Sequence, residues 1–306
     1  MKKYALGLLL FIANSSAGQN PHPAHYYNPK WSPDGKSIVF ESTRDGKSSI
    51  YTIRADGTHL QKITDTIYDY GQPDWSPDGK HLVYYGKIKP MQIFINTAQG
   101  NGQRELITIK DAYQPAWSVQ NKIAFISRSI RQPGFVSPHV ISAMNTDGTG
   151  LKLLTDTLSD SAAPCWSPDG KQILFVRTLA VNKPWKEITP EEKKRIQASR
   201  EIMLMNADGS QVQNLTNDTI KQWAPSWSKD GKTVYFLSET DSGQFVCSLG
   251  LKDKKLNTLH KLEGTVQMAS ISPDGKYITY AAERENKQAI YIWDINKRTE
   301  LKLTGD

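Results

Sequence analysis

The stretch Trp31-Ser32-Pro33-Asp34-Gly35-Lys36 decides the fold, because its last five residues recur along the chain. Identical copies begin at Ser76, Ser167 and Ser272, and degraded copies begin at Ser118 and Ser228. The six serines are separated in turn by 44, 42, 49, 61 and 44 residues. A period of this size is that of one four-stranded blade of a β-propeller. The repeat therefore predicts six blades.

Each repeat unit has the pattern of four short strands joined by tight turns. In the first unit, residues 29–32 and 37–40 flank the Pro33-Asp34-Gly35 turn, where proline sets φ, aspartate bonds its own backbone and glycine supplies a positive φ. The third copy has Asn121 in place of glycine, and asparagine is the next best residue at a left-handed φ. A third strand, Ile50-Tyr51-Thr52-Ile53, and a short fourth strand ending in Ile63-Thr64 complete the unit.

The units together predict an all-β fold, a six-bladed β-propeller of four-stranded antiparallel blades. We expect residues 19–306 to form this one domain, with blades at about 26–65, 66–108, 109–155, 156–216, 217–260 and 261–304. The last strand, residues 301–304, completes blade six by itself. This predicts that blade six packs on blade one without exchanging a strand.

Blade four carries an insertion of 17 residues, the difference between its spacing of 61 and the usual 44. Within it, Thr189-Pro190-Glu191-Glu192 has a threonine cap followed by proline at the first helical position, which predicts one short helix reaching about Ser199. The basic residues of this helix region are Lys193, Lys194, Arg195 and Arg200. The helix either covers the channel mouth or docks a partner.

The repeat resembles that of the TolB-type β-propellers. The similarity rests on Trp-Ser-Pro-Asp-Gly-Lys, a β-branched strand, Ile-Tyr with Asp-Gly, and Leu-Thr, and it extends from about Asn28 to Leu303. TolB is a periplasmic component of the Tol–Pal envelope system and has an α/β domain ahead of its propeller. The resemblance is to the propeller alone, so it implies the propeller fold and not the Tol–Pal role.

The first 18 residues predict a secretory signal peptide that is cleaved. Lys2 and Lys3 precede an apolar run from residue 5 to 13, and small or polar residues follow up to Gly18. We therefore expect a periplasmic or secreted protein that does not span the membrane. Removing the two lysines lowers the net charge from +7 to +5, and the remaining basic residues are scattered. A nucleic-acid binder concentrates its basic residues on one face, so nucleic acid is not an expected partner.

Five tryptophans, with Ile271 in the sixth unit, precede the turn serine: Trp31, Trp75, Trp117, Trp166 and Trp227. A bulky side chain there is expected to wedge between neighbouring sheets, and a stacking ladder for a ligand is the alternative. Cys165 and Cys247 are the two cysteines. Because the repeat assigns them to different strand types in adjacent blades, two unpaired thiols are favoured over a disulfide.

The strand order predicts two unlike rims. The Ser-Pro-Asp-Gly turns, which join the first and second strands, and the turns that join the third and fourth strands lie on one rim, here called the turn rim. The connections from the second to the third strand, and from each blade to the next, lie on the other, here called the loop rim. Blade three extends its loop-rim connection through residues 128–136. Variation on one rim of a repeat scaffold marks a binding face. The candidate binding residues at the loop-rim channel mouth are Tyr26, Tyr27, Asp69, Tyr70, Gln72, Tyr113, Gln114, Asp160, Gln222, Trp223, Gln267 and Met268.

Aromatic rings beside amides and isolated acids suit a peptide or a sugar. The sequence has no Gly-x-Ser-x-Gly elbow, no complete phosphate-binding loop and no paired histidine spacing, so we name no catalytic residue, cofactor or metal. The favoured function is an exported, monomeric, non-catalytic binding or scaffold module for an envelope protein, a peptide or an oligosaccharide. The alternatives are a carbohydrate-active hydrolase or lyase with its site in the channel mouth, and a regulatory domain that serves a separate peptidase.

Overall fold

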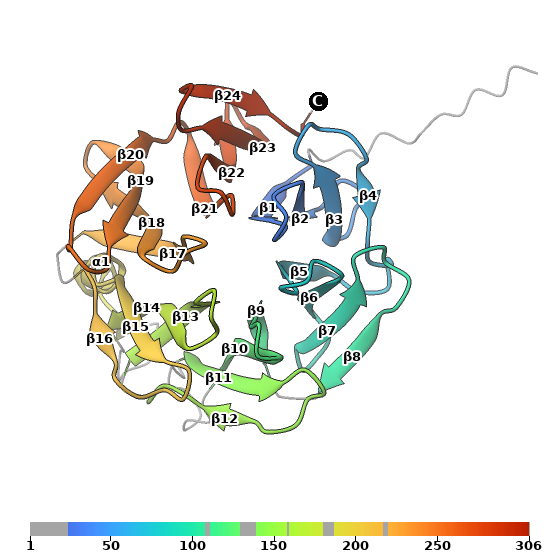
Figure 1. Cartoon of the computed structure of the whole chain (residues 1–306), viewed down its shortest axis with the longest axis horizontal. Helices are drawn as coiled ribbons and strands as arrows, with labels where there is room; N and C mark the ends of the chain where they lie inside the picture. The colour runs from blue at the N-terminus through green and yellow to red at the C-terminus, as the bar shows by residue number, and fades with distance from the viewer. Residues whose placement is uncertain are drawn as a thin grey trace, which may run out of the picture.

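Six sheets stand around a central axis in the computed structural model (Figure 1). The structure describes residues 24–107, 111–128, 139–157, 159–179, 187–216 and 220–305. Each sheet contains four strands that follow one another in the chain, and every pairing is antiparallel. The innermost strand of each blade lines the axis. This confirms the predicted six-bladed propeller.

The strands of the first three blades are β1 Tyr26–Trp31, β2 Ser37–Ser42, β3 Ser49–Arg54 and β4 Gln61–Lys62; β5 Tyr70–Trp75, β6 His81–Gly86, β7 Gln92–Thr97 and β8 Arg104–Ile107; β9 Tyr113–Trp117, β10 Lys122–Arg128, β11 His139–Asn145 and β12 Lys152–Leu153. Those of the last three are β13 Ser159–Trp166, β14 Gln172–Leu179, β15 Glu201–Asn206 and β16 Gln213–Asn214; β17 Lys221–Trp227, β18 Thr233–Thr240, β19 Gly243–Gly250 and β20 Leu256–Lys261; β21 Thr265–Ile271, β22 Tyr277–Arg284, β23 Lys287–Asp294 and β24 Thr299–Lys302.

The turn between the first two strands is closed by its own serine and aspartate. Ser32 Oγ donates to Asp34 Oδ1 at 2.6 Å and accepts the N–H of Ser37 at 3.0 Å. Gly35 has φ of 70°, and Asn121 takes the same left-handed region at 54°. The serine–aspartate bond recurs at 2.6 Å in the turns that begin at Ser76, Ser167, Ser228 and Ser272. The turn therefore forms wherever this side-chain pair recurs.

The Leu-Thr and Ile-Thr pairs of the repeat extend the pairing of the short outer strands. β4 is only two residues long, and beyond it Thr64 Oγ1 accepts the N–H of Ile50 in β3 at 3.1 Å. Three other blades repeat this bond: Thr155 with Ile141, Thr216 with Ile202, and Thr304 with Ile290. The threonine hydroxyl thus pairs a buried N–H that the short outer strand leaves without a main-chain partner.

The tryptophan indoles join adjacent blades. Trp75 Nε1 donates to the carbonyl of Lys30 at 3.2 Å, and Trp166 Nε1 donates to that of Ala116 at 3.1 Å. Trp227 repeats the bond, to the carbonyl of Cys165 at 3.2 Å. These indoles are buried. These three tryptophans therefore lie between adjacent sheets, as the first of the two interpretations predicted.

The ring closes by packing of blade six on blade one. All four strands of the sixth sheet come from residues 265–302, and Tyr26 N–H at the start of β1 donates to Gln288 Oε1 of β23 at 3.0 Å. Among the described residues, no strand is exchanged between the two blades. Both cysteines are unpaired thiols, as predicted, and Cys247 lies 3.3 Å from the hydroxyl of Ser238.

The predicted helix is present as α1, Pro190–Ala198, between β14 and β15. Thr189 Oγ1 accepts the N–H of Glu192 at 3.2 Å, and Glu192 Oε2 accepts the N–H of Thr189 at 2.9 Å, which completes a capping box. Ser199 Oγ accepts the N–H of Leu179 at 3.0 Å and so ties the helix end to β14. Of the extended loop of blade three, residues 129–138 lie outside the described part of the chain.

Candidate functional site

A bulge in the inner strands aims one side chain from each blade at the central axis. The third residue before the tryptophan has a positive φ in five of the six inner strands, and the register shifts there. A bulge of this kind changes the direction in which side chains point. The residues are Asn28, Gln72, Gln114, Ala163 and Ala224, and Met268 occupies the same place in β21. We call these six residues the waist.

Two cavities meet at the waist, since all six of its residues line both. The cavity on the loop-rim side, the loop-rim basin, has a volume of about 890 Å³ and lies mainly over blades four to six. The cavity on the opposite side, the turn-rim vestibule, has a volume of about 480 Å³ and is walled by all six blades. Both volumes are those of small-ligand sites.

The waist is divided into an amide side and an apolar side. Gln72 Oε1 accepts the N–H of Gln114 at 3.1 Å, and Gln114 Oε1 accepts the N–H of Ala163 at 2.7 Å. Glu41 Oε2 starts this series by accepting the N–H of Gln72 at 3.2 Å. The glutamines therefore pair main-chain groups that the bulges release. Alanine and methionine side chains complete the other half of the ring.

The basin holds an ion pair beside an aromatic ring. Lys221 Nζ lies 2.8 Å from Glu239 Oε2 and 5.1 Å from the centre of the Trp223 ring. Gln244 Nε2 also donates to Glu239 Oε2, at 3.1 Å. The bonds from Lys221 and Gln244 hold the pKa of Glu239 below its usual value, so this carboxylate stays ionised. Arg200 and Asp241 add two more charges to the basin wall.

Four of the predicted binding residues and Met268 reach the cavities. Gln72, Gln114 and Met268 lie in the waist, and Asp160 and Trp223 line the basin. The sequence pattern placed these residues in the loops between blades. The inner strands begin earlier than that, so most of the predicted residues lie in strands. Gln267 belongs to β21.

Tyr70, Tyr26 and Gln222 are buried, so their expected place at the mouth is wrong. Tyr70 has no exposed surface, meets Tyr84 and Phe94 edge to face at 5.5 and 5.7 Å, and donates its hydroxyl to Asp65. In a strand, alternate residues face opposite sides, and this position faces the space between blades. These side chains belong to the core.

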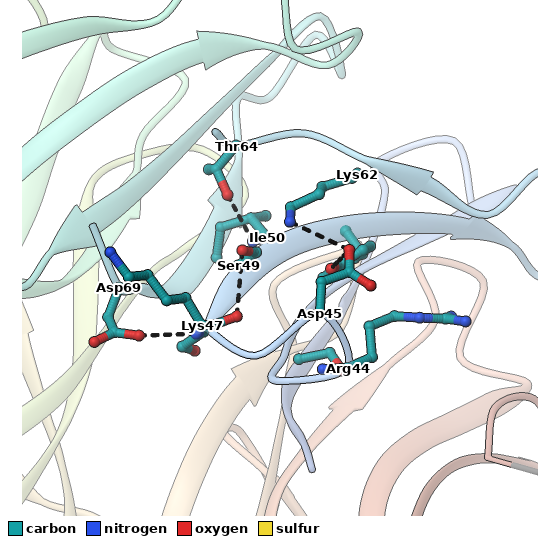
Figure 2. A network of polar contacts seen from close by, with 11 residues as sticks. Arg44, Asp45, Lys47, Ser49, Ile50, Lys62, Thr64 and Asp69 are labelled. Carbon is teal, nitrogen blue, oxygen red and sulfur yellow. Dashed lines mark hydrogen bonds and ion pairs between the residues drawn. The ribbon is translucent and has the colours of Figure 1, made fainter. Parts of the chain in front are cut away.

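Asp69 and Asp160 pair with the main chain of the blade before them. Asp69 Oδ1 accepts the N–H of Ser48 at 2.8 Å, and Figure 2 shows its carboxylate directed at the hairpin of blade one. Asp160 Oδ1 accepts the N–H of His139 at 2.7 Å and lies 2.8 Å from its Nδ1. Both carboxylates therefore join neighbouring blades. Asp160 also lines the basin.

The two remaining predicted residues are half-buried tyrosines near the loop rim. Tyr113 meets His139 edge to face at 5.5 Å, and Tyr27 stacks on His25 at 6.0 Å. Burial, together with the negative charge of Glu41, raises the pKa of Tyr27, so its hydroxyl stays protonated. Neither tyrosine lines the basin.

The sequence interpretation missed Arg200, Lys221, Glu239 and Gln244, which line the basin from β17, from the second and third strands of blade five and from the end of the blade-four insertion. The strands β18 and β19 are eight residues each, against six for β2 and β3, so the blade-five hairpin extends further at the loop rim.

The described residues bring no three histidine, cysteine, aspartate or glutamate side chains together in a way that could hold a metal ion. Three acids line the described part of the basin, Asp160, Glu239 and Asp241, of which Asp160 is bonded to His139 and Glu239 to Lys221. None of the described helices is long and apolar enough to cross a membrane. What the described basin offers is fixed charges, amides and the small exposed part of the largely buried Trp223 indole.

Fold and channel together define a six-bladed β-propeller whose channel holds two cavities of ligand size. A family model, the TolB beta propeller domain, matches residues 13–199, which is more than half of the chain. The chain therefore belongs to the TolB β-propeller family, as the resemblance of its repeats indicated.

Two curated relatives differ in how much of them the chain covers. The uncharacterized protein Atu1656 of Agrobacterium fabrum is 24% identical over 277 residues, which is 84% of this chain and 85% of that protein. The uncharacterized peptidase YuxL of Bacillus subtilis is 25% identical over 163 residues, which is 50% of this chain but 22% of the peptidase. The chain thus spans less than a quarter of the length of this peptidase.

Solved structures show the same fold. TolB from Acinetobacter baumannii superimposes with a TM-score of 0.69 at 17% identity, covering 92% of this chain and 63% of that one. An oligogalacturonate lyase in complex with manganese gives a TM-score of 0.63 at 14% identity, covering 92% of this chain and 78% of the lyase chain. At these identities the likeness is one of fold, which does not determine function.

Proposed function

We propose that this protein is a non-catalytic binding module that captures a peptide segment of a partner protein in the loop-rim basin. The observation that carries the proposal is Trp223 beside the Lys221–Glu239 ion pair, above the waist amides of Gln72 and Gln114. An aromatic surface supplies contact area to a peptide side chain, while fixed charges and amides orient its polar groups. The described basin has these groups beside one another, which supports the proposal.

The proposal includes export. The apolar run that begins at Ala5 and the small residues up to Gly18 support a cleaved signal peptide, and an envelope or secreted protein would then be the partner. Mass spectrometry of the chain purified from the cell envelope and the medium tests this directly. We expect an N-terminus at Gly18 or Gln19, and a chain that keeps Met1 in the cytoplasm would contradict it.

The binding experiment uses residues 19–306 as bait for a displayed random-peptide library, followed by fluorescence anisotropy with the enriched peptides. Replacing Trp223→Leu or Lys221→Met is expected to weaken binding about tenfold, the loss of one central contact. Lys276→Met is the matched control, because Lys276 lies in a turn at the opposite rim. Its affinity should equal that of the parent.

An oligosaccharide array and an assay for oligosaccharide cleavage, with and without Mn²⁺, run alongside with the same variants. Enrichment of sugars instead of peptides, with the same dependence on Trp223, would replace the peptide by a carbohydrate as ligand. Turnover that is lost in the basin variants would replace the binding module by the enzyme. Peptide binding that is equal in all three variants would remove the basin as the site.

A further inference from the structure

The turn-rim vestibule is a built cavity that the proposed peptide site does not use. It is bounded on one side by the waist and on the other by the second residue of each of the six turns. These turn residues are Pro33, Pro77, Val119, Pro168, Lys229 and Pro273. Between them the wall consists of five indole rings and Ile271. Its volume of about 480 Å³ falls in the range of cavities that bind small molecules.

The indoles present apolar surface to this cavity. The N–H groups of Trp75, Trp166 and Trp227 are bonded to carbonyls of the preceding blade, so they do not offer hydrogen bonds to a ligand. Prolines at the turns and in the inner strands add further apolar surface. A molecule that fills the vestibule therefore needs a largely apolar body, and flat rings match a wall of indoles best.

One charged pair gives the cavity a polar contact. The residue before each tryptophan also lines the vestibule, and in blades one and two these are Lys30 and Asp74, whose Nζ and Oδ1 are 3.0 Å apart. Asp74 Oδ2 accepts the N–H of Trp117 at 2.9 Å, so both carboxylate oxygens have partners. The ammonium group has three N–H donors and gives one to Asp74. Lys30 therefore keeps donor capacity for an oxyanion.

The inner part of the opposite wall carries no charge. Cys165, Ser226 and Ser270 hold the same position in blades four to six. Burial raises the pKa of the Cys165 thiol to about 12, so it is uncharged and does not compete with Lys30 for an anionic group. Lys30 is thus the cationic group beside the indoles, while the second lysine of the lining, Lys229, is exposed in the turn of blade five at the outer edge of the cavity.

We propose that the turn-rim vestibule is a second binding site, separate from the loop-rim basin, for a small molecule with a flat apolar body and one oxyanion directed at Lys30. The indoles hold the body and the ammonium group orients the oxyanion through a charge-assisted hydrogen bond. This site does not depend on whether the basin binds a peptide.

The test uses two fluorescent probes with the same apolar body: 1-anilinonaphthalene-8-sulfonate and the uncharged N-phenyl-1-naphthylamine. We expect one saturable site on the mature chain, with energy transfer from the indoles to the bound probe. Lys30→Met should weaken the sulfonate about tenfold, as a lost charge-assisted bond does, and change the uncharged probe less than twofold, roughly within the error of the titration. Lys30→Arg should restore sulfonate binding, and Lys36→Met, in the exposed part of the turn, is the control.

Two filling variants locate the site. Ser226→Phe and Ser270→Phe each place a ring in the vestibule and should weaken both probes about tenfold or more, since the space they need is lost. Trp223→Leu in the basin should leave both probes unaffected. Circular dichroism and thermal unfolding show which variants are folded. Absence of saturable binding, equal binding in a folded filling variant, or a sulfonate affinity that ignores Lys30 would each overturn the proposal.

Discussion

Trp166 donates its indole Nε1–H to the backbone carbonyl of Ala116, 3.1 Å away and one blade earlier. The bond recurs between blades one and two and between blades four and five. At the junction of blades six and one, Trp31 is buried in the same way, but among the described residues its Nε1 has no hydrogen-bond partner. The seam of the ring therefore lacks a contact that other blade junctions have.

This difference gives a matched pair of substitutions. Trp166→Phe removes the donor and leaves the carbonyl of Ala116 buried without it, so the free energy of unfolding should fall by about 2–4 kcal/mol, from lost ring area and the unpaired carbonyl. Trp31→Phe loses similar area but also removes a buried unpaired donor, so its loss should be smaller by about 1–2 kcal/mol. Urea titration followed by circular dichroism measures both. Equal losses would show that the indole bond does not stabilise the blade junction.

A second pair of substitutions compares a tyrosine of the core with a tyrosine near the loop rim. Tyr70 is fully buried between Tyr84 and Phe94, so Tyr70→Ala should lower the free energy of unfolding by about 3–5 kcal/mol, as for other large aromatic residues in cores. Tyr27 is half-buried, and Tyr27→Ala should cost about 1 kcal/mol. Thermal unfolding of the two variants measures the two losses of stability. A Tyr70→Ala protein with the parent's melting temperature would return this residue to the list of candidate binding residues.

The fold could be predicted because its information is local and repeated. Ser32 and Asp34 close their turn by bonding to each other, and Thr64 pairs with a strand 14 residues earlier, so each motif performs its role within one unit. Repetition then identifies the number of blades. The helix was equally predictable, since both partners of its capping box lie within four residues.

The candidate binding site could be predicted only in part, because strand alternation and long-range pairing decide which side chains line it. The bulge before Pro73 turns Gln72 toward the axis, while Tyr70, two residues earlier, faces the core. The proline two residues before the tryptophan was a sequence signal for this bulge. Proline has no N–H to donate, so within a sheet it marks an edge strand or a bulge. Glu239 and Lys221 lie 18 residues apart and meet only because their strands pair. No local pattern shows this contact.

The contact between Asp69 and blade one gives a third prediction. Asp69→Ala leaves the buried N–H of Ser48 without its carboxylate partner, and hydrogen bonds to charged groups contribute about 1.5–3 kcal/mol. The free energy of unfolding should fall by that amount, with no change in peptide affinity of the folded protein. Asp241→Ala, which removes a carboxylate from the basin wall, is the comparison and should leave stability almost unchanged. A loss of peptide binding in a fully folded Asp69→Ala protein would make Asp69 a contact residue after all.

The last prediction concerns pH and the junction of blades five and six. His260 stacks on Trp293 with ring centres 3.9 Å apart, and its Nε2 is buried without a hydrogen-bond partner among the described residues. Burial holds the pKa of His260 below its usual 6.5; Glu300 and Glu263 oppose this shift, and Arg284 adds to it. Between the folded and unfolded pKa values the unfolded chain therefore binds more protons. Stability from this group is complete above about pH 6.5 and is lost as the pH falls through the folded pKa.

The free energy of unfolding should accordingly decline when the pH is lowered from 7.5 to 5. His260→Phe keeps an aromatic ring against Trp293 but cannot take up a proton, so its decline over this range should be shallower than that of the parent. His59→Asn is the matched control: this histidine is exposed just after the Asp56-Gly57 turn at a positive φ of 57°, a conformation that asparagine accepts. Urea titrations at several pH values measure the slopes. If His260→Phe and His59→Asn lose stability with pH equally, His260 does not couple protonation to the packing of blade five on blade six.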